Sequence, residues 1–307
     1  MRALVTTPDP PHVRLGEAPE PDPDRGEAIV EVRAVSLNRG EVRRLANQEE
    51  GTVPGWDVAG VVSAVAADGS GPPEGARVIG LVRSGAWAER AAVPTSALGT
   101  LPEEVSFAAA STLPVAGLTA LRTLAVGGSV LGKRVLVTGA AGGVGRLAVQ
   151  LASRAGAHVT AVAAGPERAE GLQDLGAEDV VNELEPEGEP FDLLLESAGG
   201  DSLAAALQRV AAEGTVVSFG DSSRDPVTFE ANAFYRNVGA RVYAFLIFRD
   251  VERSGSAARD LEFLAGLVGR GELDTQVSVE SSWGDPAAPL QALMDRRVRG
   301  KAVLHID

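Results

Sequence analysis

The feature of this chain that most constrains its fold is the stretch 135–150, where an apolar strand runs without a spacer into a glycine-rich turn and a helix. Residues 135–138 are mostly β-branched, which favours a buried strand. The apolar residues that follow recur at helical spacing, and Gly156 supplies a helix stop. These apolar residues are Val144, Leu147, Ala148, Leu151, Ala152 and Ala155. A further strand over 158–163 completes a β-α-β unit and predicts a parallel sheet.

The glycines of this turn have separate predicted roles. Gly139 can leave the strand with a backbone angle that other residues avoid, and Gly145 allows the helix to pack closely. Between them, free backbone N–H groups at the helix start favour a pyrophosphate. The spacing, G-x-x-G-x-x-G, departs from the usual G-x-G-x-x-G, so a plain tight turn is the alternative; the β-α-β context disfavours it. The predicted phosphate-binding residues are Gly139, Ala141, Gly142, Gly143, Val144 and Gly145.

Small residues also follow the other expected strands of this half, at 163–165, at 198–200 and at Gly220. Ligands of open parallel sheets bind beyond the carboxyl ends of the strands. A flat, extended molecule could therefore lie across these ends, whereas ordinary turn glycines would explain each position only separately.

The residues after the second strand indicate which dinucleotide is bound. A carboxylate that would hold a ribose 2′-hydroxyl is usual there, but the chain has Ala163-Ala164-Gly165. The next helix is expected from Pro166 to Gly176. Arg168 lies in its first turn, where its guanidinium could bind a 2′-phosphate. We therefore expect NADPH, with a solvated surface arginine as the alternative.

Composition limits the remaining possibilities. The chain has 307 residues, a formal net charge of −14, no cysteine and three histidines. The length predicts two domains, and the charge disfavours nucleic acid and anionic membrane surfaces as partners. A structural zinc is not expected, because thiolate ligands are absent. No apolar run approaches a membrane span and no signal peptide is evident, so we expect a cytoplasmic protein.

Strand patterns dominate to about residue 105, and helices alternate with strands beyond it. With its motifs in order, the chain resembles the medium-chain dehydrogenase/reductase superfamily, in its zinc-free quinone oxidoreductase (zeta-crystallin-like) branch. The matching segments are 36–41, 54–62, 75–80, 85–89, 101–120, 137–145, 196–200 and 300–304. The resemblance implies an α/β protein with a GroES-like β-rich domain over 1–105, completed by 265–307. A doubly wound Rossmann domain that binds NADPH is implied over 106–264.

The same resemblance assigns roles to individual residues. It implies that Asn38 and Thr119 lie near the nicotinamide ribose. Ala198 and Gly199 are expected in the cofactor site because they follow the end of a strand. Asn38 could instead be a turn-capping residue. Further implied cofactor contacts are Phe219, Gly220, the backbone of Phe245 and Leu246, and, as a weaker match, Arg296.

Departures from the zinc-dependent relatives suggest the reaction. Asn38 stands where those relatives have a cysteine ligand, and Trp56 where they have a histidine. Without a metal to polarise an isolated carbonyl, hydride transfer suits a quinone or an α,β-unsaturated carbonyl, which spreads its own developing charge. The resemblance names no proton donor, because several relatives have a tyrosine or aspartate after the Asn38 motif, whereas this chain has Glu41, Arg43 and Arg44. Besides Asn38, Tyr243 is the candidate catalytic residue, with packing in a late strand as the alternative.

Two further predictions remain open. The apolar run 241–248 is expected to be an edge strand that pairs with its mate in a homodimer. The expected activity is that of an NADPH-dependent quinone or enone reductase. An enoyl-thioester reductase of a biosynthetic pathway, or a cofactor-binding protein with little turnover, are the alternatives. Residues lining a substrate pocket are not encoded in a recognisable pattern.

Overall fold

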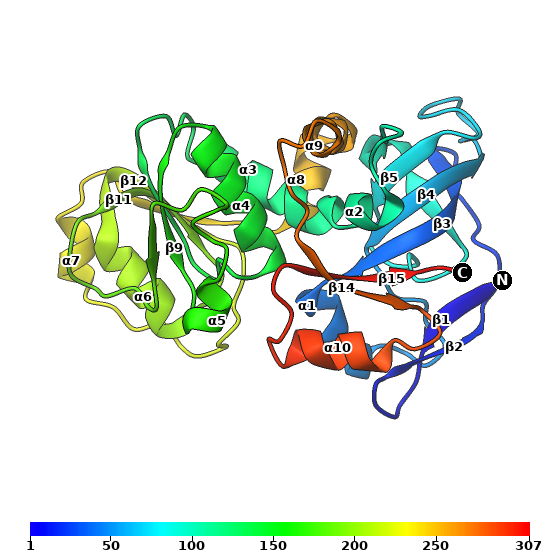
Figure 1. Cartoon of the computed structure of the whole chain (residues 1–307), viewed down its shortest axis with the longest axis horizontal. Helices are drawn as coiled ribbons and strands as arrows, with labels where there is room; N and C mark the ends of the chain where they lie inside the picture. Colours follow the sequence, from blue (N-terminus) through cyan, green and yellow to red (C-terminus); the bar gives the residue numbers. More distant parts are fainter. The chain divides into compact units, whose positions relative to one another are not determined.

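The computed structural model describes residues 1–307, except for the side chain of Ala233. The chain divides into two compact units, shown with the whole chain in Figure 1. The first contains residues 1–118 and 250–307, and the second contains residues 119–249. Among the residues described, no helix has the length and apolar character needed to cross a membrane.

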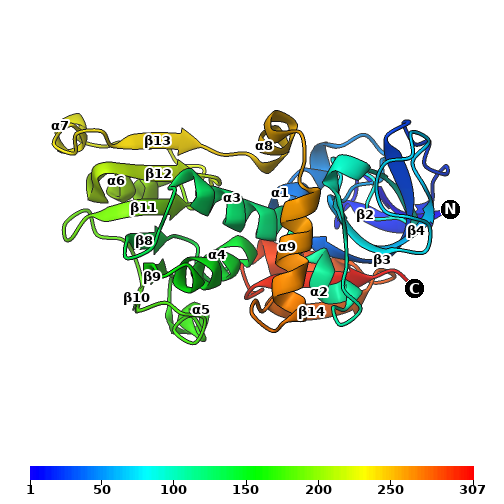
Figure 2. The same cartoon turned by 90° about the horizontal axis from the view of Figure 1, so that it is seen from above.

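The second unit is built on a six-stranded sheet whose neighbouring strands are all parallel. Its strand order is β10-β9-β8-β11-β12-β13, which Figure 2 shows from one edge to the other. The strands are β8 (Arg134–Val137), β9 (His158–Val162), β10 (Asp179–Val181), β11 (Phe191–Glu196), β12 (Val210–Ser218) and β13 (Arg241–Ala244). The parallel sheet predicted from the β-α-β pattern is confirmed.

One helix of the second unit precedes the first strand of this sheet, and the others lie between successive strands. They are α3 (Leu118–Val126), α4 (Gly143–Arg154), α5 (Pro166–Ala169), α6 (Gly200–Arg209) and α7 (Ala231–Tyr235). α4 packs on β8 and β9, and α6 packs on β11 and β12. The apolar stripe predicted for α4 is buried, with Leu147 and Ala148 fully inaccessible to solvent.

Two sequence predictions for this half are wrong in extent. The helix expected from Pro166 to Gly176 ends at Ala169, and Gly171 has a positive φ of 76°, which interrupts helical geometry. The strand expected over 241–248 ends at Ala244, and α8 (Ile247–Ser254) begins three residues later. Charged residues from Arg249 onward suit an exposed helix, with Ile247 as its buried residue.

The first unit contains a seven-stranded sheet, mostly antiparallel, in the order β14-β15-β3-β4-β5-β7, with β6 pairing on β3. Its strands are β3 (Glu27–Leu37), β4 (Asp57–Ala64), β5 (Arg77–Leu81), β6 (Arg90–Pro94), β7 (Leu98–Thr100), β14 (Val277–Ser282) and β15 (Lys301–His305). A separate pair joins β1 (Arg2–Thr6) to β2 (Val13–Glu17). Trp87 and Trp283 are the largest fully buried side chains of its core.

Short helices surround this sheet. They are α1 (Arg39–Val42), η1 (Leu45–Asn47), η2 (Thr95–Ala97), α2 (Phe107–Ser111), the π-helical turn η3 (Leu113–Gly117), α9 (Ala258–Gly269) and α10 (Ala287–Met294). The sequence predicts domain boundaries near 105 and 265, whereas the compact units divide after 118 and 249. The difference arises because α2 packs on β3 and β4, and α9 packs on β7.

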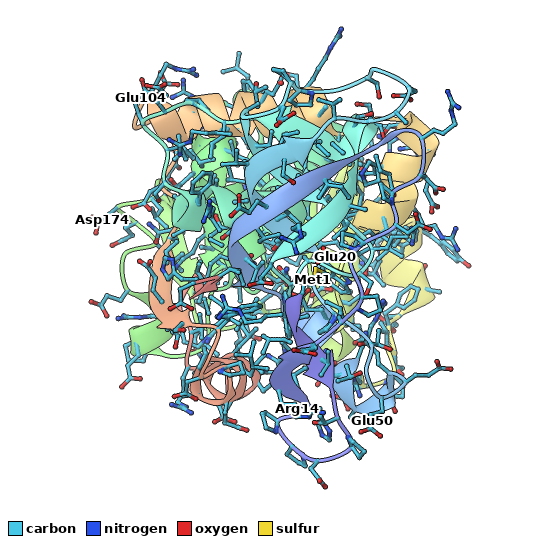
Figure 3. The ribbon with its side chains drawn as sticks, turned by 90° about the vertical axis from the view of Figure 1, so that its right-hand side faces the viewer. Met1, Arg14, Glu20, Glu50, Glu104 and Asp174 are labelled. Carbon is cyan, nitrogen blue, oxygen red and sulfur yellow. The ribbon has the colours of Figure 1, made fainter. Side chains whose placement is uncertain are left out.

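Several acidic side chains of the first unit are exposed. Figure 3 shows Glu50 and Glu104 projecting into solvent, and Met1 beside Glu20. The N-terminal ammonium lies 3.6 Å from Oε1 of Glu20, which also binds Arg90. These exposed pairs contribute little to stability, since solvent screens them.

Candidate functional site

The glycine turn between β8 and α4 has the geometry that close approach to a ligand requires. Gly139 has a positive φ of 59°, and Gly142 begins α4 in extended geometry. A Cβ atom on Gly145 would lie 2.5 Å from the Gly139 carbonyl oxygen and 2.6 Å from Cα of Ala140. A side chain at that position would therefore force the helix away from the turn. The first N–H groups of α4 have no intrahelical acceptor and are available to an anion.

A buried carboxylate fixes the neighbouring turn at the end of β11. Oε1 of Glu196, which is fully buried, accepts hydrogen bonds from the backbone N–H of Ala198 at 2.8 Å and from Oγ of Ser202 at 3.0 Å. Oγ1 of Thr138 donates to the same oxygen at 3.1 Å. Glu196 thus ties the ends of β8 and β11 together and sets the backbone at Ala198 and Gly199, two predicted contact residues.

The segment after β9 is also held from α4. The guanidinium of Arg146, in the first turn of α4, is buried, and its Nη2 donates to the carbonyl of Glu170. Asn182 accepts a hydrogen bond from Gly165 N–H at 2.6 Å. Arg168, on α5, lies between Gly165 and Glu170 in the sequence and is half-buried.

The remaining predicted residues of the second unit lie at strand ends or on α3. Phe219 N–H donates to the carbonyl of Glu196 at 2.9 Å, so Gly220 lies against Ser197 at the same sheet edge. Phe245 is buried and Leu246 is half exposed, at 52%. Among the other predictions, Thr119 is buried on α3 and Tyr243 is half-buried on β13.

The first unit brings five polar residues together in a buried polar cluster. It consists of Ser36, Asn38, Glu41, Asp57 and Lys301, all of them buried except Asn38, which is half-buried. They come from β3, the turn after it, α1, β4 and β15. The predicted residue Arg296 lies in the exposed turn before β15, with a positive φ of 61°.

Asn38 is the centre of the buried polar cluster. Its Nδ2 donates to Oδ2 of Asp57 at 2.6 Å and to Oε1 of Glu41 at 3.1 Å, and its Oδ1 accepts from Nζ of Lys301 at 2.7 Å. The backbone N–H of Asn38 also donates to Oε1 of Glu41, at 2.6 Å. Asn38 therefore caps α1, as its alternative interpretation proposed, and its amide is also bonded to all three charged neighbours.

Asp57 receives the most donors in the cluster. Besides Asn38, its oxygens accept from Oγ of Ser36 and from Val115 N–H at 2.8 Å, and Nζ of Lys301 lies 3.7 Å away. Burial raises the pKa of Asp57, and the Lys301 ammonium opposes that shift. Burial lowers the pKa of Lys301, and the carboxylate of Asp57 opposes that shift in turn. The two side chains lie within ion-pair distance, and their attraction counters the effect of burial on each pKa.

Glu41 is in a different state. Burial and the nearby Asp57 carboxylate raise the pKa of Glu41 to about 8. Its Oε2 is buried and has no hydrogen-bond partner among the described residues. Burial of a second carboxyl group beside Asp57 is therefore the reason that Glu41 holds its proton more tightly than an exposed glutamate does.

Comparisons with known proteins identify the family. The alcohol dehydrogenase GroES-like domain matches residues 24–115, and the zinc-binding dehydrogenase family matches residues 143–259. The chain belongs to the medium-chain dehydrogenase/reductase superfamily. The expected fold, a GroES-like domain with a Rossmann-type parallel sheet, is thereby confirmed.

Relatives of this dehydrogenase/reductase include quinone oxidoreductases. It is 28% identical over 312 residues to a chloroplast envelope quinone oxidoreductase homolog of Arabidopsis thaliana, covering 94% of this chain and 92% of the other. The quinone oxidoreductase from Coxiella burnetii has the same fold, with a TM-score of 0.86, 24% identity and coverage of 100% and 99%. CurK enoyl reductase also shares it, with a TM-score of 0.85, 24% identity and the same coverage. The predicted membership of the quinone oxidoreductase branch is confirmed.

Members of this superfamily are oxidoreductases that bind a nicotinamide dinucleotide, and the second unit fits such a cofactor. Gly139, Gly142, Gly143 and Gly145 carry no side chain where α4 begins, and the adjacent strand ends carry small residues. This dehydrogenase/reductase therefore has the features of an NAD(P)-binding oxidoreductase that acts on small molecules.

The zinc named in one family description does not fit the residues present. Within the described part of the chain, no three His, Asp or Glu side chains are grouped so as to hold a metal ion. His158 and His305 are each bonded to a surface glutamate, at 2.9 and 2.7 Å. At Asp57 and Asn38, the neighbouring cation is the ammonium of Lys301.

Sequence reasoning missed most of the buried polar cluster. Asp57 and Lys301 were recognised only as parts of matching motifs, and Ser36 likewise. One signal was available: charged residues at Asp57 and Lys301 each begin an apolar strand, where burial without a partner would be costly. Glu196 and Arg146 are likewise charged residues within apolar segments of the second unit.

Proposed function

We propose that this protein is a zinc-independent, NADPH-dependent oxidoreductase that transfers hydride to a quinone or an α,β-unsaturated carbonyl. The observation that carries the proposal is the buried polar cluster, in which the Lys301 ammonium binds Asn38 and lies beside Asp57. By the resemblance, Asn38 and Trp56 stand where zinc-dependent relatives have a cysteine and a histidine ligand. Without a Lewis acid, an acceptor that delocalises its own charge is the suitable substrate.

The preference for NADPH rests on the segment after β9. No carboxylate stands at residues 163–165 to bind a 2′-hydroxyl. Arg168 on α5 offers a guanidinium of the right chemistry for a 2′-phosphate, and Arg146 braces the backbone two residues further on, at Glu170. Both features favour the phosphorylated cofactor.

The protein's part in the reaction is binding, orientation and charge stabilisation. The dinucleotide, when bound, supplies the hydride. The N–H groups at the start of α4 hold its diphosphate, and the turn fixed by Glu196 shapes the neighbouring surface. Asn38 is held rigidly by Asp57, Glu41 and Lys301, so it can position a ribose hydroxyl without reorganising.

A substrate screen tests the proposal. NADPH oxidation would be followed spectroscopically with quinones, with 2-alkenals and with enoyl thioesters, before and after treatment with a chelator. We expect turnover with a quinone or an enone that chelation leaves unchanged. Activity that chelation abolishes and zinc restores would contradict the proposal.

An enoyl-thioester reductase is the second candidate. It is favoured by the shared fold with CurK enoyl reductase. Both candidates require a nicotinamide dinucleotide and a conjugated acceptor, and the thioester substrates in the same screen separate them. A cofactor-binding protein with little turnover is the third, and it would bind NADPH without consuming any of these acceptors.

We also propose that the protein is a homodimer through β13, the edge of the parallel sheet. Val242 on this strand is 51% exposed, and Val238 just before it is 73% exposed. Unpaired edges with apolar side chains are usually covered by another strand. Light scattering at micromolar concentration should give twice the 31.6 kDa chain mass. The Val242→Lys variant should give the mass of a single chain. A wild-type mass of one chain would exclude the dimer.

A further inference from the structure

A polar side chain from β10 is held against the turn that follows β9. Asn182 is the first residue after β10, and Val181 before it pairs with Val162 at the end of β9. Oδ1 of Asn182 accepts the hydrogen bond of the Gly165 backbone N–H at 2.6 Å. In Rossmann-type sheets the residue that recognises the 2′ position of the adenosine ribose stands at the end of the second strand, about 20 residues after the glycine turn. Gly165 has this spacing from Gly145, so Asn182 lies at the expected ribose position.

The turn at Gly165 has room for a ligand group. Gly165 has a positive φ of 82°, and a Cβ atom built on it would have no heavy atom of the described residues within 4 Å. Asn182 and Ala164 are both exposed. A group that approaches this turn can therefore reach the Asn182 amide from solvent.

The bond to Gly165 fixes the direction in which the Asn182 amide faces. A backbone N–H only donates, so the amide atom that faces it must be the oxygen. Nδ2 belongs to the same planar group and lies within about 5 Å of the Gly165 nitrogen. Among the described residues, none accepts a hydrogen bond from Nδ2. Asn182 therefore presents two N–H donors beside the turn, while its oxygen is already engaged.

We propose that Asn182 is a specificity-determining residue for NADPH, and that its Nδ2 donates to the 2′-phosphate. The inference deepens the proposed function and rests on it. Phosphate oxygens only accept hydrogen bonds, which matches two N–H donors, whereas a 2′-hydroxyl is usually held by a carboxylate that accepts from it. Arg168 on α5 contributes the positive charge, and Asn182 contributes donors whose direction is set by Gly165.

Asn182→Asp separates recognition of the phosphate from a purely structural role. One carboxylate oxygen can still accept from the Gly165 N–H, whereas the other replaces the two donors with an acceptor and a negative charge. The probes are NADP⁺ and NAD⁺, which differ only in the 2′-phosphate, and calorimetry measures their binding without a hydride acceptor. We expect Asn182→Asp to weaken NADP⁺ binding by at least about tenfold, the loss of a hydrogen bond to a charged group, and to change NAD⁺ binding by less than about threefold.

Asn232→Asp is the matched control, because it makes the same change of charge at an exposed position on α7. It should leave the affinity for both probes unchanged. An Asn182→Asp protein that binds NADP⁺ as tightly as the wild type would overturn the assignment. A wild type that binds NAD⁺ as tightly as NADP⁺ would instead overturn the preference for NADPH in the proposed function.

A second variant keeps the proposal testable if Asn182→Asp does not fold. Asn182→Ala removes the donors without adding a charge, and it should weaken NADP⁺ binding by about 3–10-fold with little effect on NAD⁺. Equal losses for the two probes would show that Asn182 only anchors the turn at Gly165, and would exclude it as a specificity determinant.

Discussion

Nζ of Lys301 lies 3.7 Å from Oδ2 of Asp57, and the two side chains are 3% and 0% exposed. The residues are 244 positions apart in the sequence and come from β15 and β4. Lysine is rare in this chain: Lys133 is the only other one, and the remaining basic residues are arginines. The cation of the buried polar cluster is thus a compact ammonium with three donors, which reaches Asn38, Leu37 and Asp57 at once.

We predict that Lys301→Met lowers the free energy of unfolding by about 3–5 kcal/mol, because it leaves Asp57 buried without its counter-ion. Urea denaturation of the two proteins measures the difference. Lys133→Met, at a half-buried position in the other unit, is the matched control and should change stability by less than about 1 kcal/mol. A loss at Lys301 no larger than in this control would show that the pair is not stabilising.

The pH dependence of stability should report Glu41. The pKa of its carboxyl is about 8 in the folded protein and has the ordinary value of 4.5 when unfolded. The folded state therefore binds the extra proton between these values, and the free energy of unfolding falls as pH rises through this window. Glu41→Gln should remove this part of the slope, so that denaturation curves of the two proteins diverge above pH 5. Parallel pH profiles would contradict the raised pKa.

We predict that Gly145→Ala weakens NADPH binding and lowers stability by about 1–3 kcal/mol. The new Cβ would lie 2.5 Å from the Gly139 carbonyl oxygen, so the start of α4 must shift away from the phosphate-binding turn. Fluorescence titration with NADPH and thermal denaturation measure both effects. Gly269→Ala is the control, since its Cβ would have ordinary contacts of 3.5 Å or more at the end of α9.

Arg168→Ala should raise KM for NADPH by at least about tenfold, with little effect on KM for NADH, because only the former has the 2′-phosphate. Steady-state kinetics with each cofactor give the ratio. Arg14→Ala, an exposed arginine on β2 of the first unit, should leave both constants unchanged. Equal increases for the two cofactors in Arg168→Ala would refute the assignment of NADPH.

Glu196→Ala should lower the free energy of unfolding by about 1–3 kcal/mol or more, since the N–H groups of Ala198 and Gly199 lose their acceptor in a buried site. Cofactor affinity should fall as well, because these donors fix the turn beside the proposed diphosphate site. Glu189→Gln, on an exposed side chain, serves as the control. Unchanged cofactor affinity in a destabilised Glu196→Ala protein would limit this residue to a structural role.

The sequence by itself determined the β-α-β unit, the parallel sheet and the glycine turn. These features depend on contacts between near neighbours, and apolar periodicity with glycine spacing records such contacts directly. The same local patterns were less informative where a segment ends, as the shortened α5 and the strand that stops at Ala244 show. The end of such a segment depends on a single backbone angle or on which of its side chains become buried in the core.

The tertiary structure alone decided the buried polar cluster. Asn38 and Lys301 are 263 residues apart, and their hydrogen bond exists only because β15 pairs with β3 and brings the start of one strand to the end of the other. The pairing of β3 with β4 brings Asp57 to the same amide as Glu41, and burial of the two carboxyl groups together raises the pKa of both. Proton affinity depends on surroundings that strand pairing assembles, so no local pattern in the sequence could encode it.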